Sequence, residues 1–247
     1  MRIRIRFITF WAILAVFAAI VLLKARHERG DLMDINPTPP AGRMTMNLPR
    51  PETESTTSIE KALNKRRSQR EYGKGPLSTR EVSRILWAAQ GATHGGGMRT
   101  APSAGALYPL ETYLVAGNIQ GLPAGVYRYI PQRHGLDLIV SGDVRRRLRE
   151  ASIHQDAVNS APACIVFSSV YGRSTAKYGE RGIRYTHIEA GTAAQNVALQ
   201  AVSLHLGTFV IGAFRDDDVK KVLSLSEAEE PLIIMPVGRM RAAASRL

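Results

Sequence analysis

The segment Arg66-Arg67-Ser68-Gln69-Arg70 places three guanidinium groups and a hydroxyl group within five consecutive residues. A guanidinium group can pair two oxygens of a phosphate, so this segment favours binding of a phosphate-bearing ligand. Positions 59, 62 and 63 are apolar at helical spacing, which puts the arginines near the end of a helix. Arginines are also common there because they complement the helix dipole, so the segment alone is a weak indication of a site.

A glycine-rich loop over residues 93–109 contains His94-Gly95-Gly96-Gly97, a tetrapeptide that resembles the oxyanion hole of lipases. The chain has no Gly-x-Ser-x-Gly sequence, which excludes a serine hydrolase of that kind. It also has no Gly-x-Gly-x-x-Gly and no Gly-x-x-x-x-Gly-Lys-Ser/Thr motif, so neither a Rossmann dinucleotide site nor a P-loop is indicated.

No metal centre is predicted, because the six histidines show no metal-ligand spacing. His187 and His205 share one face of a long predicted helix, but along that helix they stand about 27 Å apart. The single cysteine, Cys164, lies in the apolar run 163–167 and is expected to be a buried core residue. One cysteine also excludes an intramolecular disulfide.

The net charge of +12 and the pI near 10.2 raise the possibility of nucleic-acid binding. Residues 1–50 hold eight basic and three acidic residues, so +5 of the charge belongs to them. The densest remaining cluster, residues 145–149, follows a helix-start signal at Ser141-Gly142-Asp143 and is interpreted as a solvated helix face. Aromatic residues make up only 6% and do not alternate with basic ones, so no nucleic-acid partner is expected.

Residues 7–23 form an uncharged apolar run with three basic residues on either side: Arg2, Arg4 and Arg6 before it, and Lys24, Arg26 and Arg29 after it. Seventeen residues reach the short end of a spanning helix. A cleaved signal peptide remains the alternative, but no Ala-x-Ala site ends the run. We therefore expect an uncleaved N-terminal membrane anchor over residues 1–23, and the balanced flanking charge leaves its orientation undetermined.

Residues 24–57 are polar and rich in proline, and we interpret them as a flexible tether to one domain over residues 58–247. In that domain Ser78-Thr79-Arg80-Glu81 is a capping box that begins a helix, and Gly91 ends it. Further helices are predicted over residues 185–206 and 216–223, strands over 112–116, 163–170, 208–212 and 232–237, and a hairpin over 126–140. Helices and strands intermix without regular βαβ alternation, which favours an α+β fold.

Several segments together resemble the FMN-dependent nitroreductase superfamily. Residues 66–70 are similar to its first FMN-binding segment. Residues 101–111 are similar to the Pro-Ser-Ala-Gly-Ala-x-Tyr-Pro-x-Glu loop of its SagB/ThcOx-type dehydrogenase branch. The likeness continues through residues 177–196 and ends at Pro236-Val237-Gly238-Arg239. It implies a nitroreductase-like fold, in which helices flank a central mixed or antiparallel sheet.

The resemblance also implies a bound FMN at the interface of a homodimer. Its phosphate and ribityl groups would meet the first segment and a terminal arginine. The loop of the partner subunit and the backbone before the last helix would meet the flavin ring. The implied cofactor-binding residues are Arg66, Arg67, Ser68, Arg70, Pro102, Ser103, Ala104, Gly105, Ile211, Gly212, Ala213 and Arg239. Three residues depart from classical members, which often have Asn at the position of Ala106 and Glu-Gly at the positions of Gly212 and Ala213.

In azoline-oxidising members, a Lys-Tyr pair matching Lys177-Tyr178 removes a substrate proton while FMN takes hydride. Lys can act as a base and Tyr can relay a proton, so this chemistry is reasonable for the pair. The alternative is an exposed lysine beside a tyrosine that only packs.

We therefore expect a membrane-anchored FMN-dependent oxidoreductase of SagB/ThcOx type that transfers hydride to or from flavin N5. NAD(P)H is a possible co-substrate, and the substrate itself is a small molecule or derives from a peptide. Two alternatives stay open: an NAD(P)H-dependent nitro or quinone reductase, and a flavin-binding or scaffolding module without turnover.

Overall fold

A computed structural model describes residues 44–93 and 97–241 of the chain. The predicted membrane anchor and most of the predicted tether lie outside these residues. Within the described part, no helix combines the length and the apolar composition that crossing a membrane requires.

The centre of the fold is a seven-stranded sheet in the order β1-β6-β5-β3-β7-β9-β8. All of its neighbouring strands pair antiparallel. The strands are β1 (Thr45–Asn47), β3 (Leu110–Ala116), β5 (Gly125–Ile130), β6 (Gly135–Ser141), β7 (Ala163–Ser169), β8 (Leu206–Thr208) and β9 (Glu230–Arg239). A separate parallel pair joins β2 (Leu77–Ser78) to β4 (Ile119–Gln120).

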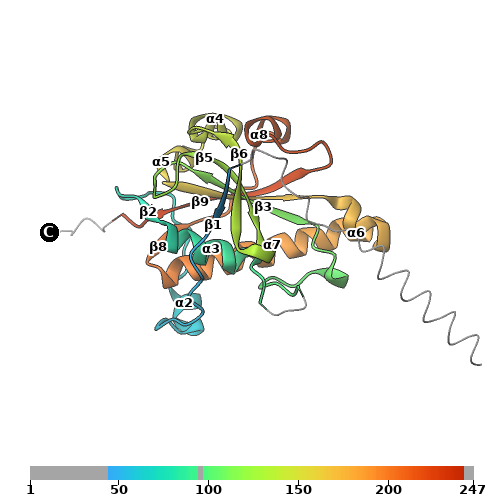
Figure 1. Cartoon of the computed structure of the whole chain (residues 1–247), viewed down its shortest axis with the longest axis horizontal. Helices are drawn as coiled ribbons and strands as arrows, with labels where there is room; N and C mark the ends of the chain where they lie inside the picture. Colours follow the sequence, from blue (N-terminus) through green and yellow to red (C-terminus); the bar gives the residue numbers. More distant parts are fainter. Residues whose placement is uncertain (1–43, 94–96, 242–247) are drawn as a thin grey trace, which may run out of the picture. The chain divides into compact units, whose positions relative to one another are not determined.

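Helices cover both faces of the sheet, so the described residues form three layers (Figure 1). One face packs against α3 (Thr79–Gln90) and α7 (Arg181–Ser203), and the other against α4 (Arg145–Ala151), α5 (Asp156–Ser160) and α8 (Asp216–Leu223). The remaining helices are α2 (Ile59–Lys65), α6 (Tyr171–Tyr178) and two short 3-10 turns, η1 (Ala104–Ala106) and η2 (Pro131–Arg133). Because both faces are covered, every residue of the central strands β3 and β7 is buried.

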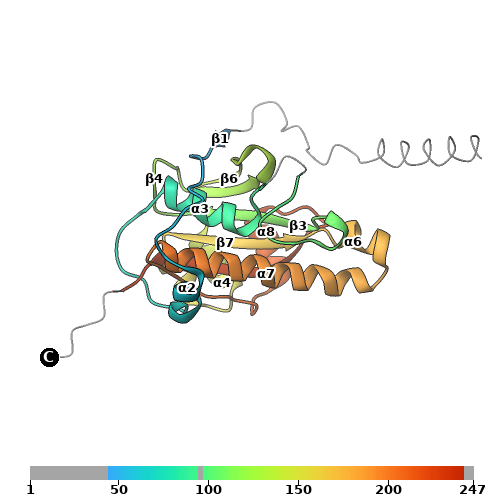
Figure 2. The ribbon, with the colours of Figure 1, turned by 90° about the horizontal axis from the view of Figure 1, so that it is seen from below.

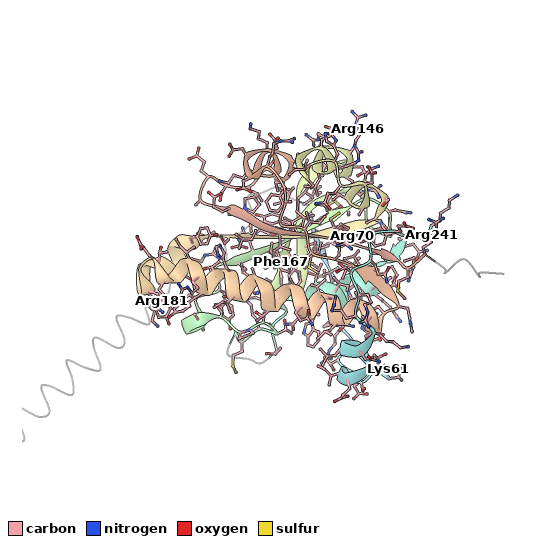
Figure 3. All side chains as sticks on the ribbon, turned by 180° about the vertical axis from the view of Figure 1, so that it is seen from behind. Lys61, Arg70, Arg146, Phe167, Arg181 and Arg241 are labelled. Carbon is pink, nitrogen blue, oxygen red and sulfur yellow. The ribbon has the colours of Figure 1, made fainter. Side chains whose placement is uncertain are left out.

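Local signals account for several of these elements. The predicted capping box is present at the start of α3: the Ser78 hydroxyl accepts from the Glu81 N–H, and the Glu81 carboxylate accepts from the Ser78 N–H. Gly91 caps the other end of α3, and the hairpin of β5 and β6 forms where its alternating pattern predicts it. Cys164 is buried, and Arg146 projects from α4 into solvent (Figure 3). These findings and the arrangement of layers confirm the predicted α+β fold.

The folded region begins earlier than the sequence indicates. Thr45–Asn47, inside the predicted tether, pairs with β6 as strand β1. The next residue, Leu48, is buried, and the Pro49 carbonyl accepts hydrogen bonds from the Ser83 hydroxyl and the His134 ring. An isolated three-residue strand carries no usable periodicity, so only its partners in the sheet reveal it.

Candidate active site

The loop before β3 has an unusual backbone. Gly105, Ala106 and Tyr108 have φ angles of 64°, 55° and 46°, in the left-handed region that residues other than glycine seldom adopt. A loop with two such non-glycine residues persists only when its surroundings hold it in place.

Lys177 and Tyr178, the last two residues of α6, lie directly against this loop. A β-carbon built on Gly105 would stand 2.6 Å from Tyr178 Oη and 3.1 Å from Lys177 Nζ. A side chain at position 105 would therefore displace the ends of Lys177 and Tyr178, and the positive φ also favours glycine there. Lys177 is exposed, while the Tyr178 ring packs edge-on against Tyr185 with 5.2 Å between centroids. The fold thus brings the predicted proton-transfer pair and the predicted loop to one place.

Tyr108 is held from three sides, and this anchors the far end of the loop. Its N–H donates to the Ser103 hydroxyl at 2.9 Å, and its carbonyl accepts from the Arg173 guanidinium at 3.0 Å. The Arg99 guanidinium lies 4.2 Å from the centroid of its ring. Arg173 also donates to Glu111 of β3 at 2.6 Å, which ties the loop to the sheet.

The arginine segment lies elsewhere, beside the edge of the sheet at β8. The Gln69 N–H donates to the Thr208 carbonyl at 3.1 Å, and the Gly73 N–H donates to the Arg239 carbonyl at 2.9 Å. Arg70 stacks over the Phe209 ring at 5.0 Å. Among the residues that the structure describes, neither Arg66 nor Arg70 has a carboxylate partner. Both guanidinium groups are therefore available to an anionic ligand.

Arg67 is separated from the other arginines of the segment. Its guanidinium donates to the carbonyls of Asn64 and Arg66. With Gln69 it lines a small cavity of about 100 Å³, whose further lining is Thr57, Lys61, Lys65, Val202, His205, Leu206 and Met240. Arg66, Ser68 and Arg70 do not line this cavity, as expected for an extended segment in which successive side chains alternate in direction.

Arg239 is at the same corner but already has a partner. Its guanidinium donates to both oxygens of Glu81 and to the Pro76 carbonyl. Burial raises the pKa of Glu81, but the hydrogen bonds from Arg239 and Ser78 outweigh it and leave the pKa lowered. The predicted contact of Arg239 with a phosphate thus competes with an ion pair at the start of α3.

The backbone after β8 continues past this corner. Ile211 is buried and exchanges two backbone hydrogen bonds with Ile234 of β9. Gly212 and Ala213 follow as exposed residues, and nothing lies within 4 Å of a β-carbon built on Gly212. This stretch leaves room for the backbone contact to a ring that the resemblance implies.

The two groups of predicted site residues stand at opposite ends of α7. The Lys177 and Tyr178 group precedes the first residue of α7, and the arginine segment pairs with residues just after its last one. Figure 2 shows α7 running from α6 at one end to α2 at the other. Figure 3 places Arg181 and Lys61 at these two ends. A helix of 23 residues is about 34 Å long, so one copy of the chain cannot bring both groups to one small ligand.

The sequence model of the nitroreductase family matches residues 63–239, which is most of the chain. The chain belongs to the nitroreductase family. This nitroreductase-family chain is 45% identical over 195 residues to MJ1384 of Methanocaldococcus jannaschii, a protein named as a nitroreductase. The match covers 79% of this chain and 97% of the relative.

Two solved structures extend the comparison. A protein of Ralstonia eutropha JMP134, assigned to the nitroreductases, has a TM-score of 0.71 and 32% identity over 80% of this chain and 90% of its own. A chain of the Escherichia coli microcin synthetase McbBCD complex, solved with truncated pro-MccB17 bound, has a TM-score of 0.63 and 27% identity. That match covers 78% of this chain and 77% of the other. The nitroreductase-like fold implied by the resemblance is therefore confirmed.

Sequence reasoning assigned no role to several residues that hold the loop. Gln90, Arg99, Arg173 and Glu189 come from three helices and the loop itself, and they meet only in the folded chain. One signal was available for Glu189, because a lone acidic residue stands among the small apolar residues of α7.

Proposed function

We propose that this protein is an FMN-dependent oxidoreductase of the SagB/ThcOx type, whose site is completed by a second copy of the chain. The observation that carries the proposal is the division of the site along α7. One end holds Lys177 and Tyr178 against the Gly105 loop, and the other holds Arg66 and Arg70 without a carboxylate partner in the described structure. An antiparallel pair of α7 helices in a two-fold dimer would bring opposite ends together.

Exposed apolar side chains on α2 and α7 support such a pairing. Ile59 and Leu63 of α2 are 62% and 53% exposed, and Ile183 and Ile188 of α7 are 40% and 58% exposed. Apolar residues that would be left in water on the helices bounding the site are typical of an interface between subunits.

The described residues fit FMN. Arg66, Arg70 and the exposed Ser68 offer two unpaired cations and a hydroxyl group to a phosphate. Gly212 and Ala213 offer exposed backbone to the flavin ring. When bound, FMN supplies a centre that accepts or donates hydride.

The chain itself would supply the proton chemistry and the placement of the substrate. A substrate that loses hydride from carbon also loses a proton from a neighbouring atom. Lys177 Nζ, in its neutral form, would take that proton, with Tyr178 Oη as relay. Gly105 keeps both groups at the surface of the loop, because a larger residue would displace them. The McbBCD relative, solved with a truncated pro-peptide, favours a peptide-derived substrate.

A second function is an NAD(P)H-driven reductase of nitro compounds or quinones. The 45% identity to the M. jannaschii protein named as a nitroreductase favours it. It shares the flavin and the dimer with the first function but needs no base at Lys177.

Two measurements test the proposal. The purified full chain should bind FMN and show flavin absorbance, and failure to retain added FMN would reject it. Bound flavin should then be titrated anaerobically with NADPH and with azoline-containing peptides. Rapid bleaching and turnover of nitroaromatics with NADPH alone would favour the second function.

Lys177→Ala separates these two functions further. The variant should keep its flavin, because the FMN phosphate and ring are assigned to Arg66, Arg70 and the backbone of residues 212 and 213, and not to Lys177. If the pair is catalytic, substrate dehydrogenation should fall by about a hundredfold or more. Lys221→Ala, an exposed lysine of α8 on the other face of the sheet, is the control and should change neither quantity. Unchanged dehydrogenation in Lys177→Ala would remove the pair from the mechanism.

A further inference from the structure

A buried carboxyl group lies beneath the loop that faces Lys177 and Tyr178. Glu189 is on α7 and only 3% exposed, and its carboxyl group lies beside the side chains of Ser103 and Gln90. Burial raises the pKa of Glu189, and the nearby Ser103, Gln90 and Arg99 oppose that rise. A buried carboxyl group costs stability, so its presence beneath a loop calls for a reason.

The Ser103 hydroxyl group can donate a hydrogen bond to Glu189. The Ser103 hydroxyl already accepts from the Tyr108 N–H at 2.9 Å. A hydroxyl group has one proton to donate, and the neighbouring Glu189 carboxyl can accept it. Ser103 can then link the helix to Tyr108, where the backbone has a positive φ.

Gln90 shows a matching arrangement on the other side. Its Oε1 accepts from the Arg99 guanidinium at 2.9 Å, which turns its NH₂ group elsewhere. That NH₂ group and Glu189 Oε1 are both buried without a hydrogen-bond partner among the described residues. One is a donor, the other is an acceptor, and the two side chains are neighbours. A small adjustment would therefore satisfy both groups.

The arrangement of charged side chains around the loop is a further argument for a role of Glu189. Three arginines, Arg99, Arg128 and Arg173, lie around Tyr108 and β3. Glu111 is engaged by two of them, with contacts of 2.7 Å to Arg128 and 2.6 Å to Arg173. Arg99 stacks on Tyr108 and is itself largely removed from solvent, and Glu189 adds to Glu111 as a negative charge that favours the ionised form of Arg99.

We propose that Glu189 is a positioning residue, which acts through Ser103, Gln90 and Arg99. It holds the loop of residues 103–108, with its positive φ angles at Gly105, Ala106 and Tyr108, in the conformation that places Gly105 against Lys177 and Tyr178. Its importance for turnover rests on the proposed function, but its effect on the loop does not.

Amide hydrogen exchange on the full chain tests the effect on the loop directly. Glu189→Ala should speed exchange of the amides of residues 103–108 by about tenfold and leave β7 unchanged. Ser103→Ala breaks the same link while it keeps the carboxyl group, and it should speed the same amides. Glu189→Gln keeps the shape and one acceptor, so it should rescue most of the protection, with exchange no more than about threefold faster.

Glu150→Gln, which changes an exposed glutamate of α4, is the matched control and should leave the loop unchanged. Unchanged exchange over residues 103–108 in both Glu189→Ala and Ser103→Ala would overturn the proposal. Should Glu189→Ala not fold, Ser103→Ala decides the question alone.

Kinetics then separate this inference from the proposed function. If both hold, Glu189→Ala should lower kcat by about tenfold with KM for the electron donor changed less than about twofold, because the loop is misplaced while the donor site is intact. A wild-type chain without flavin chemistry would reject the proposed function, and the exchange data would still decide the role of Glu189. Normal kcat in Glu189→Ala together with a loosened loop would show that loop placement does not limit turnover and would overturn the catalytic part.

Discussion

Arg239 forms an ion pair in the folded chain, and this ion pair limits the role that the sequence predicts for it. The resemblance assigns it to a cofactor phosphate, yet its guanidinium binds Glu81, the residue that also completes the capping box of α3. Glu81 therefore connects the start of a core helix to the corner where the arginine segment lies. Loss of its charge should affect both stability and the orientation of Arg239.

We expect Glu81→Gln to lower the free energy of unfolding at pH 7 by about 1 kcal/mol, because it weakens the cap and removes the ion pair. The pKa of Glu81 is lowered in the folded chain, so its ionised form adds stability above the ordinary value of 4.5. That stability should be lost as pH falls through the folded-state pKa. Urea unfolding from pH 7 to pH 3 measures both effects. The fall in the free energy of unfolding over this pH range should be smaller in Glu81→Gln than in the wild type.

Glu227→Gln is the control for this series, since Glu227 is exposed and outside the capping box. It should follow the wild-type pH dependence. If Glu81→Gln loses as much stability between pH 7 and pH 3 as the wild type does, another carboxylate controls acid unfolding.

At the scale of elements, the loop before β3 is a strained segment held between two helices. α6 supplies Lys177 and Tyr178 on one side, and α7 supplies Glu189 on the other. Strain at positions 106 and 108 is sustained because Ser103, Arg99 and Arg173 fix Tyr108. An element of this kind can be relaxed locally without loss of the surrounding fold.

Ala106→Gly should relieve part of this strain. Ala106 is exposed with a φ of 55°, so glycine removes a steric cost without opening a cavity. We expect the free energy of unfolding to rise by about 0.5 kcal/mol, the conformational benefit being partly offset by the greater freedom of glycine in the unfolded chain. Thermal unfolding measures the change. Ala104→Gly, two residues earlier and outside the positive-φ positions, should instead be destabilising, and equal effects of both substitutions would argue against strain at Ala106.

At the scale of the whole molecule, the proposed site divides between copies of the chain. Two inactive variants should therefore complement each other in a mixed dimer, which would not happen if each site lay within one chain. Arg66→Ala and Lys177→Ala remove opposite ends of the site, and each variant alone should be inactive. Mixed before refolding or co-expressed, they should form dimers in which one of the two sites contains both intact ends.

Random pairing of equal amounts should restore about a quarter of wild-type activity, since half of the dimers are mixed and each has one intact site. Mixing Lys177→Ala with Tyr178→Ala is the control. Both changes lie at the same end, so every site keeps a defect and activity should not return. Absence of rescue in the first mixture, with mixed dimers verified by mass, would contradict the divided site.

The membrane anchor over residues 1–23 stays a prediction, because it lies outside the described residues. We expect the full chain to remain with membranes after an alkaline wash, since a continuous apolar run inserts by its own hydrophobicity. A chain that begins at residue 24 should be released and retain β1, whose first residue is Thr45. A mature N-terminus found after residue 23 would instead favour the cleaved signal peptide.

Much of the local structure could be predicted from the sequence because its causes are local. Ser78 and Glu81 cap a helix three residues apart, and Asp216–Leu223 forms the predicted helix α8. Alternation in residues 126–140 predicts a hairpin that the structure contains. The sequence also predicts the long helix, over residues 185–206. In the structure it begins at Arg181 and ends at Ser203, and the positive φ of His205 stops it from continuing.

The tertiary structure alone decided which residues meet. Burial of apolar faces on both sides of the sheet set α7 across the molecule, and this put the Arg66 segment and the Lys177 pair at opposite ends of a 23-residue helix. The same packing turned Arg67 away from its neighbours and enclosed Glu189 beneath the loop. Spacing along the chain determines periodicity and capping, which act over a few residues. Contacts between distant segments depend on how whole faces pack, and no local pattern in the sequence specifies that.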